Sequence, residues 1–225
     1  MATVVGVVVF PGSNCEFDVV EAVQTLGGEG RLLWHADDSL GDVDAVVLPG
    51  GFAHGDYLRP GAIARFSPIM GAVAAHAAAG GPVVGICNGF QVLCEAGLLP
   101  GALQKNAGLK FLCRPVAVRV TAGDSALTTG VDVGTELTIP VNHFEGNYTC
   151  EPGTLAELRA DDRIVLRYVD NPNGSMDDIA GICSPGRNVV GLMPHPERAC
   201  HPLLGSTDGA PLLRSLLVRA GALTA

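Results

Sequence analysis

The chain has 225 residues, the length of one large domain, and 48% of them are hydrophobic, which excludes a disordered protein. Lys and Arg number 14 against 23 Asp and Glu, a formal net charge of −9 that disfavours general binding to nucleic acids or anionic membrane surfaces. The longest apolar run, residues 69–86, is interrupted by His76, Gly80, Gly81 and Pro82, so it does not read as a membrane span.

The amino terminus and the cysteines point to a cytoplasmic protein. No Lys or Arg precedes Arg31, so the charged region of a signal peptide is missing. The seven cysteines are an odd number without zinc-like spacing, which fits free thiols in a reducing compartment. We expect one cytoplasmic domain over residues 1–225.

The first half of the chain alternates expected strands with expected helices. The Val-rich residues 3–10 predict a strand buried on both faces, and Ser13 and Asn14 are candidate N-caps for a helix to about Leu26. Further strands are expected at 31–34, 44–48 and 83–86, and further helices at 62–79 and 88–96. This alternation predicts an α/β fold, an open and mostly parallel sheet flanked by helices.

Beyond Phe111 the pattern changes to short runs between Gly, Pro, Asn and Asp. These runs predict strands at 116–121, 136–141, 155–159, 164–169, 179–183 and 189–193. Leucines at 212, 213, 216 and 217 predict a closing helix over 212–220. The second half is therefore expected to extend the sheet in antiparallel or mixed fashion.

The sharpest motif is Gly-Ile-Cys-Asn-Gly at 85–89, between an expected strand and an expected helix. G-x-C-x-G has the form of a nucleophile elbow with Cys in place of Ser. Side chains at Gly85 and Gly89 would collide with the neighbouring strand or helix. The turn places Cys87 at the carboxyl end of the sheet and at a helix amino terminus, which favours the thiolate. We expect Cys87 to be a nucleophile and the other six cysteines to be ordinary thiols.

A thiolate nucleophile needs a base, and His195 is the best candidate. It follows the expected strand 189–193 directly, and prolines on both sides restrict its backbone. Glu197 can accept the second ring N–H and stabilise the imidazolium. The sequence predicts a catalytic triad of Cys87, His195 and Glu197.

Acyl transfer also requires donors for an oxyanion. The elbow supplies the backbone N–H of Asn88. The second donor is expected from Gly51, in the turn Pro49-Gly50-Gly51, where a missing Cβ lets the backbone approach a substrate.

Together, the Pro-Gly-Gly turn, Gly-x-Cys-x-Gly-x-Gln and His-Pro-Glu resemble a class I (triad-type) glutamine amidotransferase. Four stretches, 10–15, 51–59, 167–175 and 194–198, are similar to the glutaminase subunits of phosphoribosylformylglycinamidine synthase, and the resemblance runs from about residue 4 to 219. Asn142 and Phe144 flank His143 where that family usually has Ala and Gly, and Ala53-His54 replaces the usual Ser-Tyr.

The resemblance implies a Rossmann-like α/β sandwich that hydrolyses the side-chain amide of glutamine. Cys87 would attack the amide, Asn88 and Gly51 would bind the oxyanion, and Gln91 would bind substrate. It further implies that this chain binds no metal or cofactor. ATP and Mg²⁺ would be used by a separate PurL-like synthetase subunit, joined by a small PurS-like subunit.

The sequence also agrees with the need for a partner, because it contains no Gly-rich phosphate-binding loop of the type G-x-x-x-x-G-K-[ST]. We therefore expect the isolated chain to hydrolyse glutamine poorly until docking completes the turn around Gly51. Three alternatives remain open: the glutaminase of another pathway such as GMP or anthranilate synthesis, a DJ-1/PfpI-like cysteine-elbow protein, and a non-catalytic scaffold subunit of the same fold.

Overall fold

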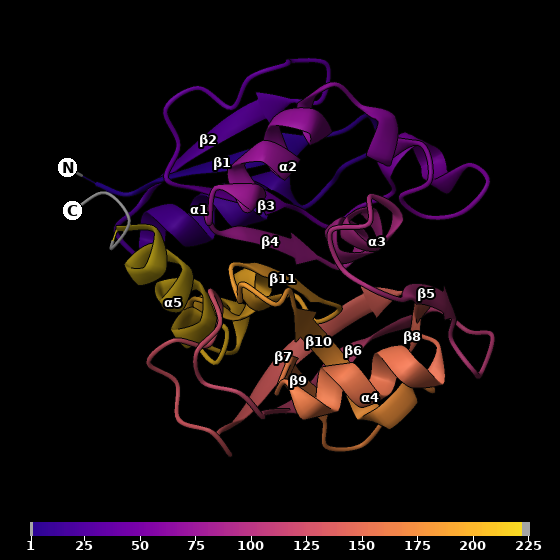
Figure 1. The fold of residues 1–225 in the computed structure, drawn as a ribbon. Coiled ribbons are helices and arrows are strands. Elements are labelled where there is room, and N and C mark those ends of the chain that lie inside the picture. The colour runs from indigo at the N-terminus through magenta and orange to yellow at the C-terminus, as the bar shows by residue number, and fades with distance from the viewer. Residues whose placement is uncertain (1, 222–225) are drawn as a thin grey trace.

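The structure, a computed structural model, describes residues 2–221 and is built on one large sheet (Figure 1). In this part of the chain the nine strands of that sheet lie in the order β2-β1-β3-β4-β11-β10-β9-β6-β7. Their bounds are β1 Val4–Val9, β2 Glu29–Trp34, β3 Ala45–Leu48, β4 Val83–Ile86, β6 Leu112–Val120, β7 Glu136–His143, β9 Ile164–Tyr168, β10 Ile179–Cys183 and β11 Val189–Leu192. The expected single domain spans 1–225, of which residues 1 and 222–225 lie outside the described residues.

Parallel and antiparallel pairing divide the sheet as expected. β1 pairs in parallel with β2 and β3, β3 with β4, and β4 with β11. β10, β9, β6 and β7 continue the sheet in antiparallel fashion. Every residue of β3 and β4 is buried, which is why these strands read as unbroken apolar runs.

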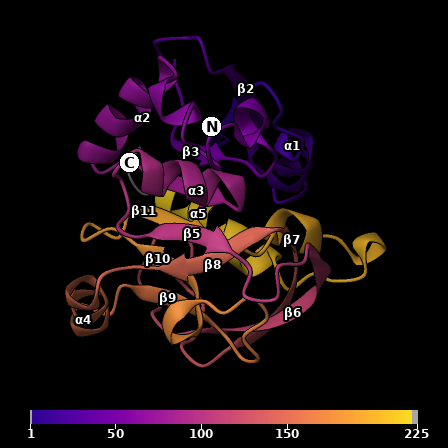
Figure 2. The ribbon, with the colours of Figure 1, turned by 90° about the vertical axis from the view of Figure 1, so that its right-hand side faces the viewer.

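Five α-helices accompany the strands within residues 2–221. Their bounds are α1 Glu16–Thr25, α2 Ile69–Ala78, α3 Asn88–Glu95, α4 Pro152–Ala160 and α5 Ala210–Gly221. In Figure 2, α1 and α2 lie on opposite sides of the parallel strands, the arrangement that right-handed crossovers in opposite directions produce. None of these helices is long and apolar enough to cross a membrane.

Two expectations for secondary structure are wrong. Residues 155–159, expected as a strand, belong to α4, which begins with Pro152 at its first turn and buries Leu158. The helix expected over 62–79 is interrupted, because Ser67 adopts an extended backbone before Pro68 and α2 begins only at Ile69.

Two smaller differences concern the amino-terminal cap and a second sheet. Cys15 is the N-cap residue of α1, while the Ser13 hydroxyl accepts a bond from the Phe10 N–H at 3.1 Å. A separate two-stranded antiparallel sheet, β5 (Ala102–Lys105) with β8 (Glu145–Thr149), was not expected at all. Its strands are short and carry no clear apolar alternation, so the pattern gives little signal.

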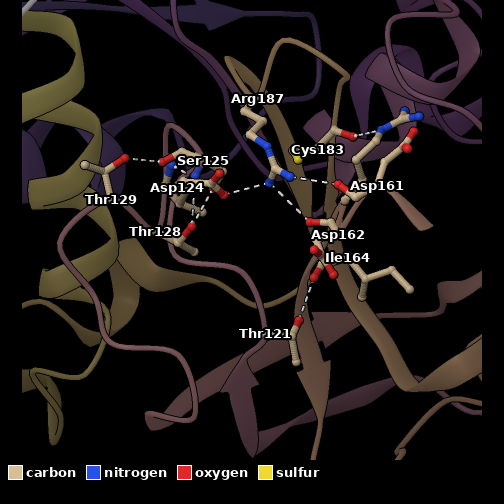
Figure 3. Close-up of polar contacts among 12 residues, drawn as sticks. Thr121, Asp124, Ser125, Thr128, Thr129, Asp161, Asp162, Ile164, Cys183 and Arg187 are labelled. Carbon is tan, nitrogen blue, oxygen red and sulfur yellow. Dashed lines mark hydrogen bonds and ion pairs between the residues drawn. The ribbon is translucent and has the colours of Figure 1, made fainter. Parts of the chain in front are cut away.

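Arg187 fixes the turn between β10 and β11, at the end of the sheet opposite the elbow (Figure 3). Its guanidinium pairs with Asp124 at 2.6 Å and donates to the carbonyls of Asp161 and Asp162 at 2.7 and 3.2 Å. These carbonyls follow the end of α4, so the cation meets the negative end of that helix. These contacts anchor the β10–β11 hairpin to Asp124 and to the segment that follows α4. The hairpin leads into β11, which ends at the candidate site.

Candidate active site

Cys87 occupies a strained turn between β4 and α3. Its φ is 51° and its ψ is −106°, a conformation that non-glycine residues rarely adopt. A Cβ on Gly89 would lie 1.9 Å from the Leu48 carbonyl oxygen, and one on Gly85 would lie 2.6 Å from the backbone of Gly89. Both glycines are therefore required for the sharp turn, as the motif indicated.

The parallel pairing of β4 and β11 brings the two distant motifs together. Leu192 lies opposite Ile86, and the Cys87 N–H donates to the Leu192 carbonyl at 2.8 Å. Both strands therefore end at the same level of the sheet. The residues that follow them, Cys87 and His195, line one cleft.

His195 and Glu197 form a buried pair behind this cleft. Nδ1 of His195 lies 2.6 Å from Oε1 of Glu197, and the two side chains are 1% and 0% exposed. The His195 N–H donates to the Pro140 carbonyl at 2.8 Å, which fixes the backbone there. Burial opposes protonation, but the charges of Glu197 and Cys87 outweigh it and hold the pKa of His195 well above its usual value. The site therefore favours the protonated, imidazolium form of His195.

The two predicted oxyanion donors, Asn88 and Gly51, come from different segments of the chain. Asn88 is the first residue of α3, and Gly51, with φ 145°, lines the cleft. Gly51 and Ser13 lie opposite each other in an isolated antiparallel β-bridge. Its two hydrogen bonds are made by the neighbouring residues, from the Phe52 N–H to the Gly12 carbonyl at 2.9 Å and from the Asn14 N–H to the Gly50 carbonyl at 3.4 Å. The N–H of Gly51 takes part in neither bond.

Gly50 sets how closely this turn approaches His195. A Cβ there would lie 2.7 Å from Cε1 of His195 and 3.0 Å from Sγ of Cys15. We expect Gly50→Ala to displace the imidazole and to lower the rate of substrate hydrolysis by about 100-fold. The measurement is kcat/KM beside a thermal melt.

Gly71→Ala is the matched control, because a Cβ at this position in α2 meets nothing within 4 Å. We expect it to retain the wild-type rate and to gain about 0.5 kcal/mol of stability. Wild-type activity in Gly50→Ala would show that close contact between the turn and His195 is unnecessary.

The predicted substrate residue Gln91 lies in the cleft but is engaged within the protein. Its Nε2 donates to the Glu145 carbonyl at 2.6 Å, and its Oε1 accepts from Nδ2 of Asn88 at 2.8 Å. The Asn88 side chain also accepts from the Ala53 N–H at 3.0 Å. This network holds the amino terminus of α3 against the turn after Gly51.

Cys15 and Asp56 are two of the cleft residues to which the sequence analysis assigned no role. Cys15, expected as an ordinary thiol, lines the cleft, and its sulfur accepts from Nη2 of Arg198 at 3.2 Å. Within residues 2–221, one group of three His, Cys, Asp or Glu residues has all its possible metal-ligand atoms within 4.8 Å of one another. It consists of Cys15, His195 and Glu197. The other residue is Asp56. It lies in the stretch Gly-Asp-Tyr-Leu-Arg, residues 55–59, to which the sequence analysis assigned no chemical role.

Asp56 carries a charge that the fold disfavours. Its burial and the nearby Glu145 raise its pKa from 3.8 to about 6, although Nδ2 of Asn88 donates to it at 3.2 Å. The folded-state pKa exceeds the unfolded one, so the ionised carboxylate destabilises the protein above pH 6 and has no effect below about pH 4.

We therefore expect Asp56→Asn to be more stable than the wild type at pH 8, by about 1 kcal/mol after allowing for solvent screening. The difference should shrink as the pH falls from 6 to 4. Thermal melts across this range measure it, and a constant difference at all pH values would contradict the assignment of the effect to this charge.

Comparison with known proteins assigns the family. The family model of the CobB/CobQ-like glutamine amidotransferase domain matches residues 2–209. The phosphoribosylformylglycinamidine synthase subunit PurQ of Rubrobacter xylanophilus is 63% identical over 216 residues, covering 96% of this chain and 98% of that protein. The chain belongs to the PurQ family of glutamine amidotransferases.

Solved structures agree with the fold of this amidotransferase. A chain in the structure of PurLQS from Thermotoga maritima matches with a TM-score of 0.89 and 42% identity, over 97% of this chain and 99% of that one. A putative GMP synthase subunit from Thermoplasma acidophilum matches over 100% and 96% with a TM-score of 0.72 but 18% identity, a likeness of fold alone. The predicted fold class is confirmed, and PurQ membership excludes a DJ-1/PfpI-like protein.

Proposed function

We propose that this chain is the glutaminase subunit of phosphoribosylformylglycinamidine synthase. It hydrolyses L-glutamine to glutamate and ammonia, and a synthetase subunit uses the ammonia to convert formylglycinamide ribonucleotide to formylglycinamidine ribonucleotide in purine biosynthesis. The observation that carries the proposal is the strained Cys87 elbow in one cleft with the buried His195–Glu197 pair, in a chain of the PurQ family.

The first half of the reaction forms a thioester. The Cys87 thiolate attacks the side-chain carbonyl carbon of glutamine, and the oxyanion is bound by the N–H groups of Asn88 and Gly51. His195 donates its Nε2 proton to the departing nitrogen, so the C–N bond breaks and ammonia leaves. The raised pKa of His195 supports this role, because the ring holds that proton before the attack.

The second half hydrolyses the thioester. Neutral His195 removes a proton from water, and the resulting hydroxide attacks the acyl carbon through a second oxyanion at the same donors. The C–S bond breaks, glutamate leaves, and Cys87 returns to the thiolate. Glu197 accepts from Nδ1 in both halves and stabilises the imidazolium whenever His195 holds the second proton.

The proposed partners are a PurL-like synthetase, which uses ATP and Mg²⁺, and a small PurS-like subunit. The Thermotoga maritima structure that this chain resembles is named PurLQS. We further infer that the chain acts in the cytoplasm as one glutaminase domain and binds no cofactor. Its seven cysteines are free thiols, in line with a reducing compartment.

Apolar side chains beside the cleft support docking at its mouth. Phe52, Tyr57 and Leu58 are 47%, 73% and 88% exposed, and they flank Asp56 on the segment that follows Gly51. Covering them by a partner would order the segment and fix the orientation of the Gly51 N–H. The isolated chain should therefore be a poor glutaminase.

The test combines the chain with a PurL-like synthetase, a PurS-like subunit, ATP, Mg²⁺ and formylglycinamide ribonucleotide. We expect glutamate release to rise well above that of the isolated chain, together with formation of the amidine. If the isolated chain makes the amidine, or if the other subunits leave its glutaminase rate unchanged, the partnered-subunit proposal is wrong. If glutamine is not hydrolysed in any mixture, the chain is a scaffold.

A further inference from the structure

His143, the last residue of β7, has no part in the triad but lines the same cleft as Cys87 and His195. Its side chain is almost fully buried, at 4% exposure. Its Nε2 atom is buried and has no hydrogen-bond partner among the described residues. A buried polar atom of this kind is costly unless a ligand or water satisfies it.

The hydrogen bonds of Asn106 determine which nitrogen of His143 carries the proton. Nδ2 of Asn106 donates to the carbonyls of Lys110 and His143 at 2.9 and 3.0 Å. Its Oδ1 accepts from the Gly146 N–H at 3.1 Å. The amide orientation is therefore fixed from both ends.

Oδ1 of Asn106 also lies 3.1 Å from Nδ1 of His143, and an amide oxygen can only accept. Nδ1 must therefore carry the hydrogen. Burial and the charge of nearby His195 lower the pKa of His143 to about 4, so the ring is neutral near pH 7. It follows that Nε2 presents a lone pair and acts only as an acceptor.

The surroundings of Cys87 divide into a donor side and an acceptor side. The N–H groups of Asn88 and Gly51 are donors. On the other side lies the end of β7, where the Asn142 carbonyl is 3.7 Å from Sγ of Cys87 and His143 follows directly. A primary amide matches this division, because its oxygen accepts and its NH₂ group donates.

We propose that Nε2 of His143 accepts a hydrogen bond from the NH₂ group of the substrate amide and so makes the site selective for amides over esters. This inference rests on the proposed hydrolysis of glutamine. The bond turns the nitrogen so that its lone pair faces His195, whose proton it receives as the C–N bond breaks. The hydrogens that remain on nitrogen stay directed to His143 until ammonia leaves.

The test compares L-glutamine with L-glutamate γ-methyl ester in the assembled complex. Both substrates give the same acyl-enzyme, but the leaving oxygen of the ester has no hydrogen to donate. The ratio of kcat/KM for the two substrates therefore isolates the bond to the leaving group. The variants are His143→Leu, which removes the acceptor, and His143→Gln, which retains an acceptor oxygen.

We expect His143→Leu to lower kcat/KM for glutamine by about 10- to 100-fold and for the ester by less than about threefold. His143→Gln should recover part of the amide activity. If both substrates lose activity equally, or neither does, His143 is structural or holds only water, and the inference is overturned. A wild-type complex that hydrolyses no glutamine would instead contradict the proposed function.

Discussion

Replacing Cys87 by Ala is expected to lower glutamine hydrolysis by about 10,000-fold or more, because no other group at the elbow can form the thioester. The fold should persist. Ala keeps the Cβ and the positive φ of the turn, and only the sulfur beside the Asn142 carbonyl is lost. We expect a stability cost of about 1 kcal/mol. Glutamate release measures the activity, and a thermal melt measures the fold.

Cys87→Gly separates chemistry from backbone strain. It should be equally inactive, yet more stable than Cys87→Ala by about 1 kcal/mol, because glycine adopts φ 51° without steric cost. A diazo-ketone analogue of glutamine should label Cys87 and spare Cys15, which lies in the same cleft. Retention of the wild-type rate by Cys87→Ala, or labelling of Cys15 instead, would exclude Cys87 as the nucleophile.

His195→Ala is expected to lose nearly as much activity as Cys87→Ala, since nucleophile and base act as a unit. Glu197→Gln should lose less, because it keeps a hydrogen-bonding oxygen for Nδ1 and removes only the charge that supports the imidazolium. The measurement is kcat/KM for glutamine in the assembled complex, with each variant beside the wild type.

Stability needs a separate control here, because His195→Ala leaves the Glu197 carboxylate buried without its partner. We expect this to cost about 3 kcal/mol. The double variant His195→Ala/Glu197→Gln removes that charge and should regain part of the stability while staying inactive. If His195→Ala hydrolyses glutamine like the wild type, the base lies elsewhere, and His143 is the other imidazole in the cleft.

The elements that the sequence predicted well are those whose signal is local. The Val-rich strands β1, β3 and β4 are buried on both faces, so their apolar runs are continuous. Short segments at the periphery were harder. Residues 155–159 resemble a strand because five residues are too few to show the 3.6-residue period of a helix. What makes them helical is the start of α4 at Pro152 and the packing of Leu158.

The sequence by itself determined the elbow and the His-Pro-Glu turn. A Cβ at Gly85 would meet the backbone of Gly89, four residues on, and a Cβ at Gly89 would meet the Leu48 carbonyl of the neighbouring strand, so only glycine fits at either position. The predicted pairing of His195 with Glu197 required only a short turn, and the structure has it at 2.6 Å. Each of these features leaves a short motif in the sequence, so the motif is enough to predict it.

Only the tertiary structure decided which other side chains share the cleft. β11 lies beside β4 in the sheet order, and this placement alone brings His195 to Cys87. Cys15 and Asp56 also line the cleft, although the sequence analysis gave neither side chain a chemical role. The tautomer of His143 depends on Asn106, 37 positions away, because its Oδ1 lies 3.1 Å from Nδ1 and can only accept. Long-range contacts of this kind leave no local pattern, so the fold must supply them.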